Sequence, residues 1–155
     1  MDAIEHYFWG KMNGLAVELG ALDGSQNSKS MTCEYERSLK WRRILVEGNP
    51  TYRENLVKLS PKAFSVSAAI CQQQGTVHFA PAEFTGGVAE FMSAKFMKEY
   101  HPDIYRSGTP AGNLSSVDWT LFPRVKEVDC IPLWTVFHSA RASHINFFIL
   151  DVEVQ

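Results

Sequence analysis

A short apolar run that ends in a glycine-containing loop constrains this fold most strongly. Residues 15–19 read Leu-Ala-Val-Glu-Leu and are closed by Gly20, which is the pattern of a buried parallel strand. Residues 21–29 are rich in Gly, Ser and Asn, so a loop follows this strand. A second apolar run at 44–46 ends in Glu47 after a helix-sized gap. Strand, loop, helix and strand in this order predict a parallel α/β sheet with flanking helices.

The remaining sequence continues the alternation of helices and strands. We expect a helix at 30–39 with Ser28 or Ser30 as N-cap, and a second strand at 41–47. Later elements are expected as a helix at 52–59 with Pro50 near its start, strands at 64–70 and 77–79, a helix at 88–100, a loop at 101–116, a strand at 125–131, a helix at 133–141 and a buried strand at 145–152.

Composition excludes several classes of function. Hydrophobic residues make up 45% of the chain and charged residues 21%, so a packed core is expected. A net charge of −2 gives no electrostatic reason to bind nucleic acid or an acidic membrane surface. No run approaches the ~18 apolar residues of a membrane helix, so no direct membrane insertion is expected. The basic cluster of Lys40, Arg42 and Arg43 is interpreted as a solvated face.

The cysteines and histidines predict neither a disulfide framework nor a metal site. Cys33, Cys71 and Cys130 are far apart and odd in number, so we expect buried, reduced thiols. The histidines lack the spacing of metal ligands, and no metal is expected. The N-terminus has early acids and no apolar secretory segment, which predicts a cytoplasmic protein, with an upstream membrane anchor left open.

The loop after the first strand is the first candidate for ligand binding, because such loops lie at the carboxyl edge of a parallel sheet. Gly20 and Gly24 would let the backbone approach a ligand without a Cβ clash. The loop has no G-x-G-x-x-G, and the acids Glu18 and Asp23 would repel a pyrophosphate. These acids suit a cationic ligand with an amino group, which favours S-adenosylmethionine over a dinucleotide.

The end of the second strand is the second candidate. Glu47 lies 23 residues after Gly24, close to the ~20 residues expected in an adenosine-binding unit. A carboxylate there can accept both hydroxyls of a ribose, and the neighbouring Asn49 can reach the adenine edge. Each acid taken singly can also be a solvated loop residue, so spacing alone leaves both interpretations open.

Several segments resemble, in the same order, motifs of FkbM-type S-adenosylmethionine-dependent methyltransferases, and the similarity covers most of residues 14–153. The segments are LAVELGALDG (15–24), SKS (28–30), WRRILVEGNP (41–50), SAAI (67–70), DCIPL (129–133) and INFFILDVE (145–153). The resemblance implies a Rossmann-like class I methyltransferase fold over a single domain, 1–155, in which 80–124 form an irregular insert or lid.

The resemblance also assigns roles to individual residues. It implies that S-adenosylmethionine is the cofactor, with Glu47 on its ribose and Ala68 and Ala69 along its adenine. Asp151 would face the methyl-transfer site, with Glu153 close by, as the base or as a group that orients the substrate. A structural carboxylate at the strand end is an equal alternative for Asp151. The methionine part of the cofactor would contact Glu18, Gly20, Ala21, Asp23 and Gly24.

The family pattern continues as Asp-Val-Glu-Gly, whereas Val154 takes the place of the glycine here. Further strands that close the substrate pocket in the family are not in this sequence, so we expect an incomplete fold or fragment. Its last strand would be a bare apolar edge.

Three functions remain open at this point. The first is O-methylation of a hydroxyl on a small molecule or sugar, with residues 80–124 shaping the choice of acceptor. The second is a non-catalytic FkbM-like binding or trafficking protein. The third, a nicotinamide-dependent oxidoreductase, lacks the phosphate-binding loop.

Overall fold

The computed structural model describes residues 7, 8, 10–82 and 85–152, which divide into two compact units. We call them the parallel-sheet unit and the mixed-sheet unit. The parallel-sheet unit contains the described residues up to Glu47, then Thr51–Val66 and Trp134–Asp151. The mixed-sheet unit contains residues 48–50, the described part of Ser67–Leu133, and Val152.

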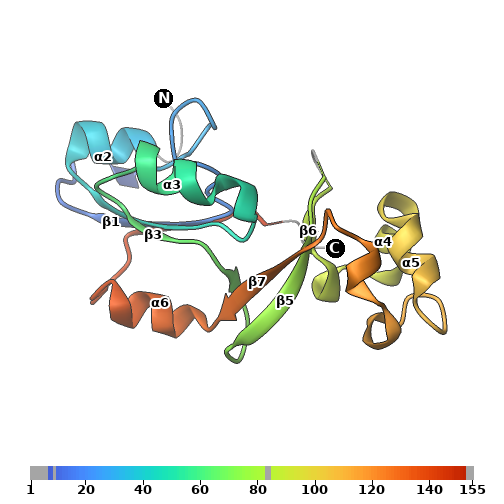
Figure 1. Cartoon of the computed structure of the whole chain (residues 1–155). Coiled ribbons are helices and arrows are strands. Elements are labelled where there is room, and N and C mark those ends of the chain that lie inside the picture. The colour runs from blue at the N-terminus through green and yellow to red at the C-terminus, as the bar shows by residue number, and fades with distance from the viewer. Residues whose placement is uncertain (1–6, 9, 83–84, 153–155) are drawn as a thin grey trace. The chain divides into compact units, whose positions relative to one another are not determined.

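The parallel-sheet unit is built on four parallel strands in the order β3-β2-β1-β8. Helices α2 and α3 lie on one side of this sheet and α6 lies on the other (Figure 1). The predicted α/β class, with a parallel sheet flanked by helices, is therefore confirmed. The elements are β1 (Leu15–Leu19), α2 (Cys33–Leu39), β2 (Arg42–Val46), η1 (Pro50–Tyr52), α3 (Arg53–Leu59), β3 (Phe64–Val66), α6 (Leu133–Ser139) and β8 (Phe147–Leu150).

The strands at the centre of this sheet form where the apolar runs predict them. Every residue of β1 is buried, and so are the last four residues of β2. Trp41, just before β2, is also buried, and its indole N–H donates to the carbonyl of Lys11 at 2.7 Å. At the sheet edge, β8 exposes the side chains of Phe148 and Leu150, as expected for a bare apolar edge.

The start of the first helix differs from the prediction. Helix α2 begins at Cys33 after Thr32, and Thr32 makes no side-chain capping bond. The hydroxyls of Ser30 and Thr32 donate instead to Glu18. Serine and threonine before a helix favour an N-cap, in which the hydroxyl oxygen accepts a helix N–H, but here both hydroxyls point to the buried carboxylate of Glu18 and donate to it.

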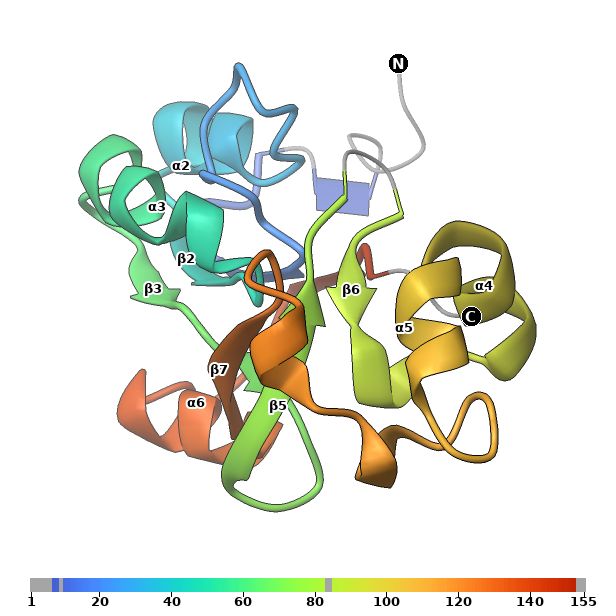
Figure 2. The ribbon, with the colours of Figure 1, turned by 45° about the vertical axis from the view of Figure 1, so that its right-hand side comes forward.

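The mixed-sheet unit is built on a second sheet in the order β4-β7-β5-β6. Strand β4 runs parallel to β7, whereas β5 is antiparallel to both β7 and β6. Helices α4 and α5 lie side by side in this unit (Figures 1 and 2). The elements are β4 (Ala69–Ile70), β5 (Gly75–Ala80), β6 (Gly87–Val88), η2 (Ala89–Phe91), α4 (Ala94–Tyr100), α5 (Pro102–Ser107), η3 (Leu114–Ser116), η4 (Trp119–Leu121) and β7 (Lys126–Ile131).

Two hydrophobic cores stabilise the mixed-sheet unit. One lies on the sheet, where Val77 and Phe79 of β5 pack with Val128 of β7. The other joins the helices to the segments around them and contains Ala80, Ala89, Met97, Ile104, Val117, Phe122 and Val125. Residues 80–124 therefore supply all but one of the buried residues of this second core.

A disulfide between Cys71 and Cys130 crosses this sheet, so the prediction of reduced thiols is wrong for these two residues. The N–H of Cys71 donates to the carbonyl of Ile131 at 3.0 Å, and Cys130 pairs with Ala69 in the adjoining ladder. The pairing of neighbouring strands brings the two thiols together across a sequence separation of 59. Cys33 is a free thiol.

The predicted strand at 64–70 is divided between the two sheets. Phe64–Val66 pairs with β2, whereas Ala69–Ile70 pairs with β7. An apolar run indicates which residues are buried, but it does not say which strand accepts their hydrogen bonds. The change of partner at Ser67 and Ala68 therefore left no signal in the sequence.

Two predictions between residues 88 and 116 are also wrong. The expected helix at 88–100 is interrupted, because Met92 is extended and the hydroxyl of Ser93 accepts the N–H of Phe96 at 3.2 Å to cap α4. The expected loop at 101–116 contains α5, which begins at Pro102 and buries Ile104. Proline lacks an N–H and has a helical φ, so it starts this helix where we had interpreted it as a loop residue.

Candidate functional site

The loop after β1 lies where the strand order of the parallel sheet changes direction. Strands β2 and β3 follow on one side of β1, and β8 pairs with the other side. In doubly wound sheets, ligands bind at the carboxyl ends of the strands at such a point. The last residue of β1 is in register with the last residues of β2 and β8. The structure therefore brings Gly20, Glu47 and Asp151, three residues chosen from the sequence, to one edge.

Glu47 is tied directly to the loop. Its side chain is buried, with 6% of the residue exposed, and its Oε2 accepts the N–H of Leu22 at 2.8 Å. Its own N–H donates to the carbonyl of Val66 in β3 at 3.0 Å. Leu22 has a φ of 51°, a strained conformation for a side chain of this size. The carboxylate of Glu47 thus holds the loop in a shape that it would not adopt by itself.

The two glycines of the loop are required by the chain's own packing. A Cβ on Gly20 would overlap the carbonyl oxygen of Asp151, and one on Gly24 would lie 2.5 Å from Leu45 Cδ1 and from Ser60 Oγ. Both glycines also have positive φ, 84° and 67°. We had expected these glycines to leave room for a ligand, but neighbouring strands and side chains fill that room. Ala21 is buried against this packing.

Glu18 holds the second half of the loop. It is 3% exposed, and its carboxylate accepts the hydroxyl of Ser30 at 2.7 Å and that of Thr32 at 2.5 Å. The N–H of Met31 donates to its other oxygen at 3.1 Å. A buried carboxylate with three donors is well stabilised. The charge of Glu18 is therefore used to fasten the segment before α2.

Asp23 forms a local turn in the same loop. Its Oδ1 accepts the N–H of Ser25 at 2.9 Å, two residues further along the chain. Burial acts to raise the pKa of the Asp23 carboxyl, but hydrogen bonds from Ser28 and Ser25 outweigh it and hold the pKa below its ordinary value. Asp23 is therefore a negative group at neutral pH, and it is only partly buried.

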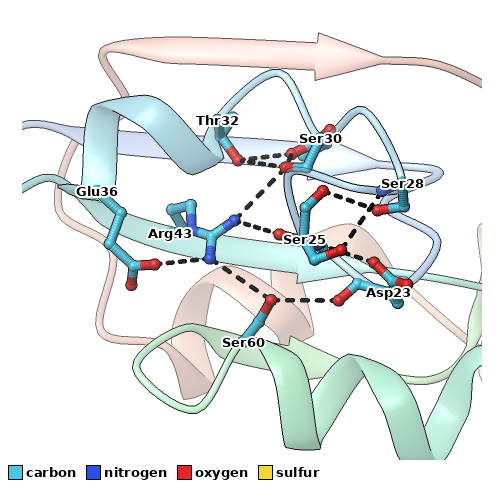
Figure 3. Close-up of polar contacts among 10 residues, drawn as sticks. Asp23, Ser25, Ser28, Ser30, Thr32, Glu36, Arg43 and Ser60 are labelled. Atoms are coloured by element: carbon cyan, nitrogen blue, oxygen red, sulfur yellow. Dashed lines mark hydrogen bonds and ion pairs between the residues drawn. The ribbon is translucent and has the colours of Figure 1, made fainter. Parts of the chain in front are cut away.

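Arg43 is the residue of this region that we misjudged. We interpreted it as part of a solvated basic face, but only 3% of it is exposed. Its Nη1 donates to the carbonyl of Gly24 at 2.8 Å, and its Nη2 pairs with Glu36 of α2 at 2.6 Å. Figure 3 shows the guanidinium between this carboxylate, the loop and Ser60. The strand pattern gave no signal for this burial, because all four residues of β2 from Arg43 onward are buried and the strand does not alternate.

The other predicted site residues are placed in different surroundings. Asp151 is exposed, and its carboxylate has no hydrogen-bond or ion-pair partner among the described residues, while its N–H donates to the carbonyl of Leu19 at 3.0 Å. Asn49, Ala68 and Ala69 belong to the mixed-sheet unit, where Ala68 and Ala69 are buried. Glu153 lies outside the described residues.

The mixed-sheet unit contains a second polar arrangement that the sequence analysis did not identify. The ring of His78 stacks on Trp119 at 4.1 Å between centroids, and its Nδ1 contacts Glu90 Oε1 at 2.6 Å. Both oxygens of Glu90 also accept the backbone N–H of His78, at 3.0 and 3.1 Å. Glu90 thus supplies an acceptor for this N–H of β5 at the point where β6 has ended. His101 is buried, and its Nε2 contacts the carbonyl of Thr85 at 2.9 Å, so its ring has a structural role.

Within the described ranges, no three His, Cys, Asp or Glu side chains are grouped so that they could hold a metal ion. None of the helices in this part of the chain is long and apolar enough to cross a membrane. Comparison of the chain with protein-family models, with curated proteins and with solved structures gives no match.

Proposed function

We propose that this chain binds S-adenosylmethionine at the loop after β1 and acts as a methyltransferase on a hydroxyl group of a small molecule or sugar. One observation carries the proposal. A buried carboxylate, Glu47, ends β2 and is bonded at 2.8 Å to the N–H of Leu22 in the loop, at the switch point of the parallel sheet. Methyl transfer is inferred from the motif resemblance, and the geometry supports only the binding of the cofactor.

The residues at this edge fit an adenosine with a positively charged amino-acid tail. Glu47 would accept the ribose hydroxyls, as carboxylates at this position do. Asp23 is ionised and partly exposed nearby in the loop, where it would favour a cationic group. The carboxylate of Glu18 has three donors of its own, so it would contribute by holding the loop. The roles of Asn49, Ala68 and Ala69 beside the adenine stay predictions.

The bound cofactor would supply a methyl group on a positively charged sulfur. The protein's part is then alignment of the acceptor hydroxyl and, where needed, removal of its proton. Asp151 is suited to either task, because its exposed carboxylate follows β8 at the same edge and no described side chain engages it.

Titration calorimetry tests the binding claim. We expect heat with S-adenosylmethionine and S-adenosylhomocysteine and none with NAD. Glu47→Ala should weaken binding by more than about tenfold. Glu47→Gln keeps an acceptor for the N–H of Leu22 and should lose less, which separates loop shape from charge. Glu54→Gln, on the exposed side of α3, is the matched control. No heat for the wild type with S-adenosylmethionine contradicts the proposal, and binding of NAD would support the oxidoreductase reading.

Methyl transfer needs its own measurement. With labelled S-adenosylmethionine and a panel of sugars and small hydroxylated compounds, we expect label in product for the wild type and about a hundredfold less for Asp151→Asn. The affinity for S-adenosylmethionine should stay the same in this variant, since only the side chain changes. Equal transfer rates in the two proteins would remove Asp151 from the reaction.

A non-catalytic binding protein is the second candidate, and one observation favours it. Glu18, Gly20 and Gly24 are all explained by packing and hydrogen bonds within the chain. A scaffold would need them as much as an enzyme would, so these residues do not favour catalysis. Binding of S-adenosylmethionine without any labelled product would support this candidate.

The compartment also stays a prediction. A cytoplasmic location is the prediction from the sequence, whereas the Cys71–Cys130 disulfide is typical of oxidising compartments. Mass spectrometry decides between them if the protein is alkylated in denaturant directly from its native cells, because denaturation exposes the buried Cys130. Alkylation of all three cysteines supports the cytoplasm, and alkylation of Cys33 alone supports an oxidising compartment.

A further inference from the structure

We infer that Arg43 is a positioning residue, which fixes the loop after β1 in its ligand-binding shape before any ligand arrives. The inference rests on the proposed function in so far as the ligand is S-adenosylmethionine. Its structural basis is the buried guanidinium of Arg43 in β2, which pairs with Glu36 of α2. The guanidinium also contacts the loop, directly at the carbonyl of Gly24 and through Ser60 at the carbonyl of Asp23.

The contacts of Arg43 converge on residues 23 and 24. Nη1 donates directly to the carbonyl of Gly24 at 2.8 Å. Nη2 lies 3.5 Å from the hydroxyl of Ser60, which itself donates to the carbonyl of Asp23 at 3.2 Å. Figure 3 shows this chain of contacts running from the guanidinium through Ser60 to the loop. Both carbonyls are thereby turned toward β2 and α3.

The other end of the guanidinium is anchored on a helix. Nη2 pairs with Glu36 at 2.6 Å, and the side chain of Glu36 is itself largely buried, with 18% exposed. The Nη1 atom also lies 3.5 Å from the hydroxyl of Ser30, which is bound to Glu18. The guanidinium presents its donors in a rigid, planar fork that reaches several acceptors in fixed directions, whereas a lysine has a single ammonium on a flexible stem.

Stability alone does not account for an arginine at this place. Burial of a charge is costly, and buried ion pairs can often be replaced by apolar side chains without loss of stability. The Nε of Arg43 is moreover buried without a hydrogen-bond partner among the described residues, a further cost. What the arginine adds is a defined backbone path, since Glu47 holds Leu22 and Arg43 holds Gly24 two residues later.

Hydrogen exchange of the ligand-free protein tests the positioning role directly. In Arg43→Lys, we expect amides of residues 20–30 to exchange at least about tenfold faster, while β1 and β2 exchange at the wild-type rate. Arg42→Lys is the matched control, because Arg42 is the neighbouring residue of β2 and donates to the carbonyl of Ala140 instead. Glu36→Gln weakens the same anchor without a change in the arginine, and it serves if Arg43→Lys does not fold.

Titration with S-adenosylmethionine completes the test. Arg43→Lys should raise Kd more than about tenfold with the same number of binding sites, whereas a loss of folded protein would lower the number of sites and leave Kd unchanged. Unchanged exchange in the loop, or faster exchange with an unchanged Kd, overturns the inference. If the wild type does not bind S-adenosylmethionine while the loop of the variant still exchanges faster, the proposed cofactor is wrong and the positioning role of Arg43 stands.

Discussion

The two units fix their shapes by different means. Among the described residues, the buried polar side chains of the parallel-sheet unit are Glu18, Thr32, Arg43, Glu47 and Ser60, whereas the mixed-sheet unit has only His101. The mixed-sheet unit relies on hydrophobic packing and on a disulfide. Buried polar groups are costly unless each one is paired. In the parallel-sheet unit these groups are paired around the loop after β1, so hydrogen bonds and an ion pair define the backbone path of this loop.

Reduction of the Cys71–Cys130 disulfide should cause the largest loss of stability, and this loss should be confined to the mixed-sheet unit. For a closed loop of this length, chain entropy gives about 4 kcal/mol of stabilisation. Urea unfolding with and without reductant measures it, and hydrogen exchange locates it. Cys33→Ala should change little, because Cys33 is a free thiol. An equal unfolding midpoint in both conditions would show that the cross-link does not stabilise this unit.

A pair of glycine substitutions compares the backbones of the two units. Gly20→Ala should destabilise the protein by about 3 kcal/mol, because its φ is positive and a Cβ would overlap the carbonyl oxygen of Asp151. Gly75→Ala in β5 should change stability by less than about 0.5 kcal/mol, since a Cβ there meets no atom within 4 Å. Thermal unfolding of both variants measures this, and similar losses would contradict the close approach at Gly20.

The smallest effect should appear in the dependence of the free energy of unfolding on pH. Hydrogen bonds from Ser28 and Ser25 lower the pKa of Asp23 against the opposing effect of burial. The ionised form therefore adds stability above the unfolded-state pKa of about 3.9, and this contribution is lost as the pH falls through the lower folded-state value. At pH 7 the free energy of unfolding should be about 1 kcal/mol higher for the wild type than for Asp23→Asn. Urea unfolding should show the difference narrowing below about pH 4, and a difference that persists in acid would exclude the charge as its cause.

Asp103 of the mixed-sheet unit provides the contrast. Burial acts to raise its pKa as well, but here the lowering comes mainly from the hydrogen bond and charge of Arg124, at 2.7 Å. Both side chains are more than 40% exposed, so salt should screen the pair. In 0.5 M NaCl, the pH-dependent difference in the free energy of unfolding between the wild type and Asp103→Asn should shrink. The corresponding difference for Asp23→Asn should persist. Equal sensitivity to salt would show that the two carboxylates are held alike.

Local sequence patterns predicted the parallel sheet well. The apolar run before Gly20 gave β1 to the residue, and the run before Glu47 gave β2 to within one residue at each end. Both strands are mostly apolar, apart from Glu18 in β1 and the two arginines at the start of β2, and each apolar run stops at a glycine or an acid. The edge that unites Gly20 and Glu47 followed from the predicted parallel sheet, whereas Asp151 was placed there by the motif resemblance alone.

Features that depend on distant partners could not be predicted in this way. The division of 64–70 between two sheets and the pairing of Cys71 with Cys130 depend on segments far away in the chain. The burial of Arg43 depends on simultaneous contacts with Gly24, Glu36 and Ser60. Arginine is exposed in most proteins, so its burial against Glu36 needed a three-dimensional contact to become visible.

The disulfide also changes what a protease can achieve. Helices α4 and α5 lie between Cys71 and Cys130 in the chain, so a cut in either helix divides the backbone inside a covalently closed ring. The two fragments remain attached through sulfur and migrate as one molecule until a reductant is added. A nicked form of this protein would therefore keep both halves of the mixed sheet together.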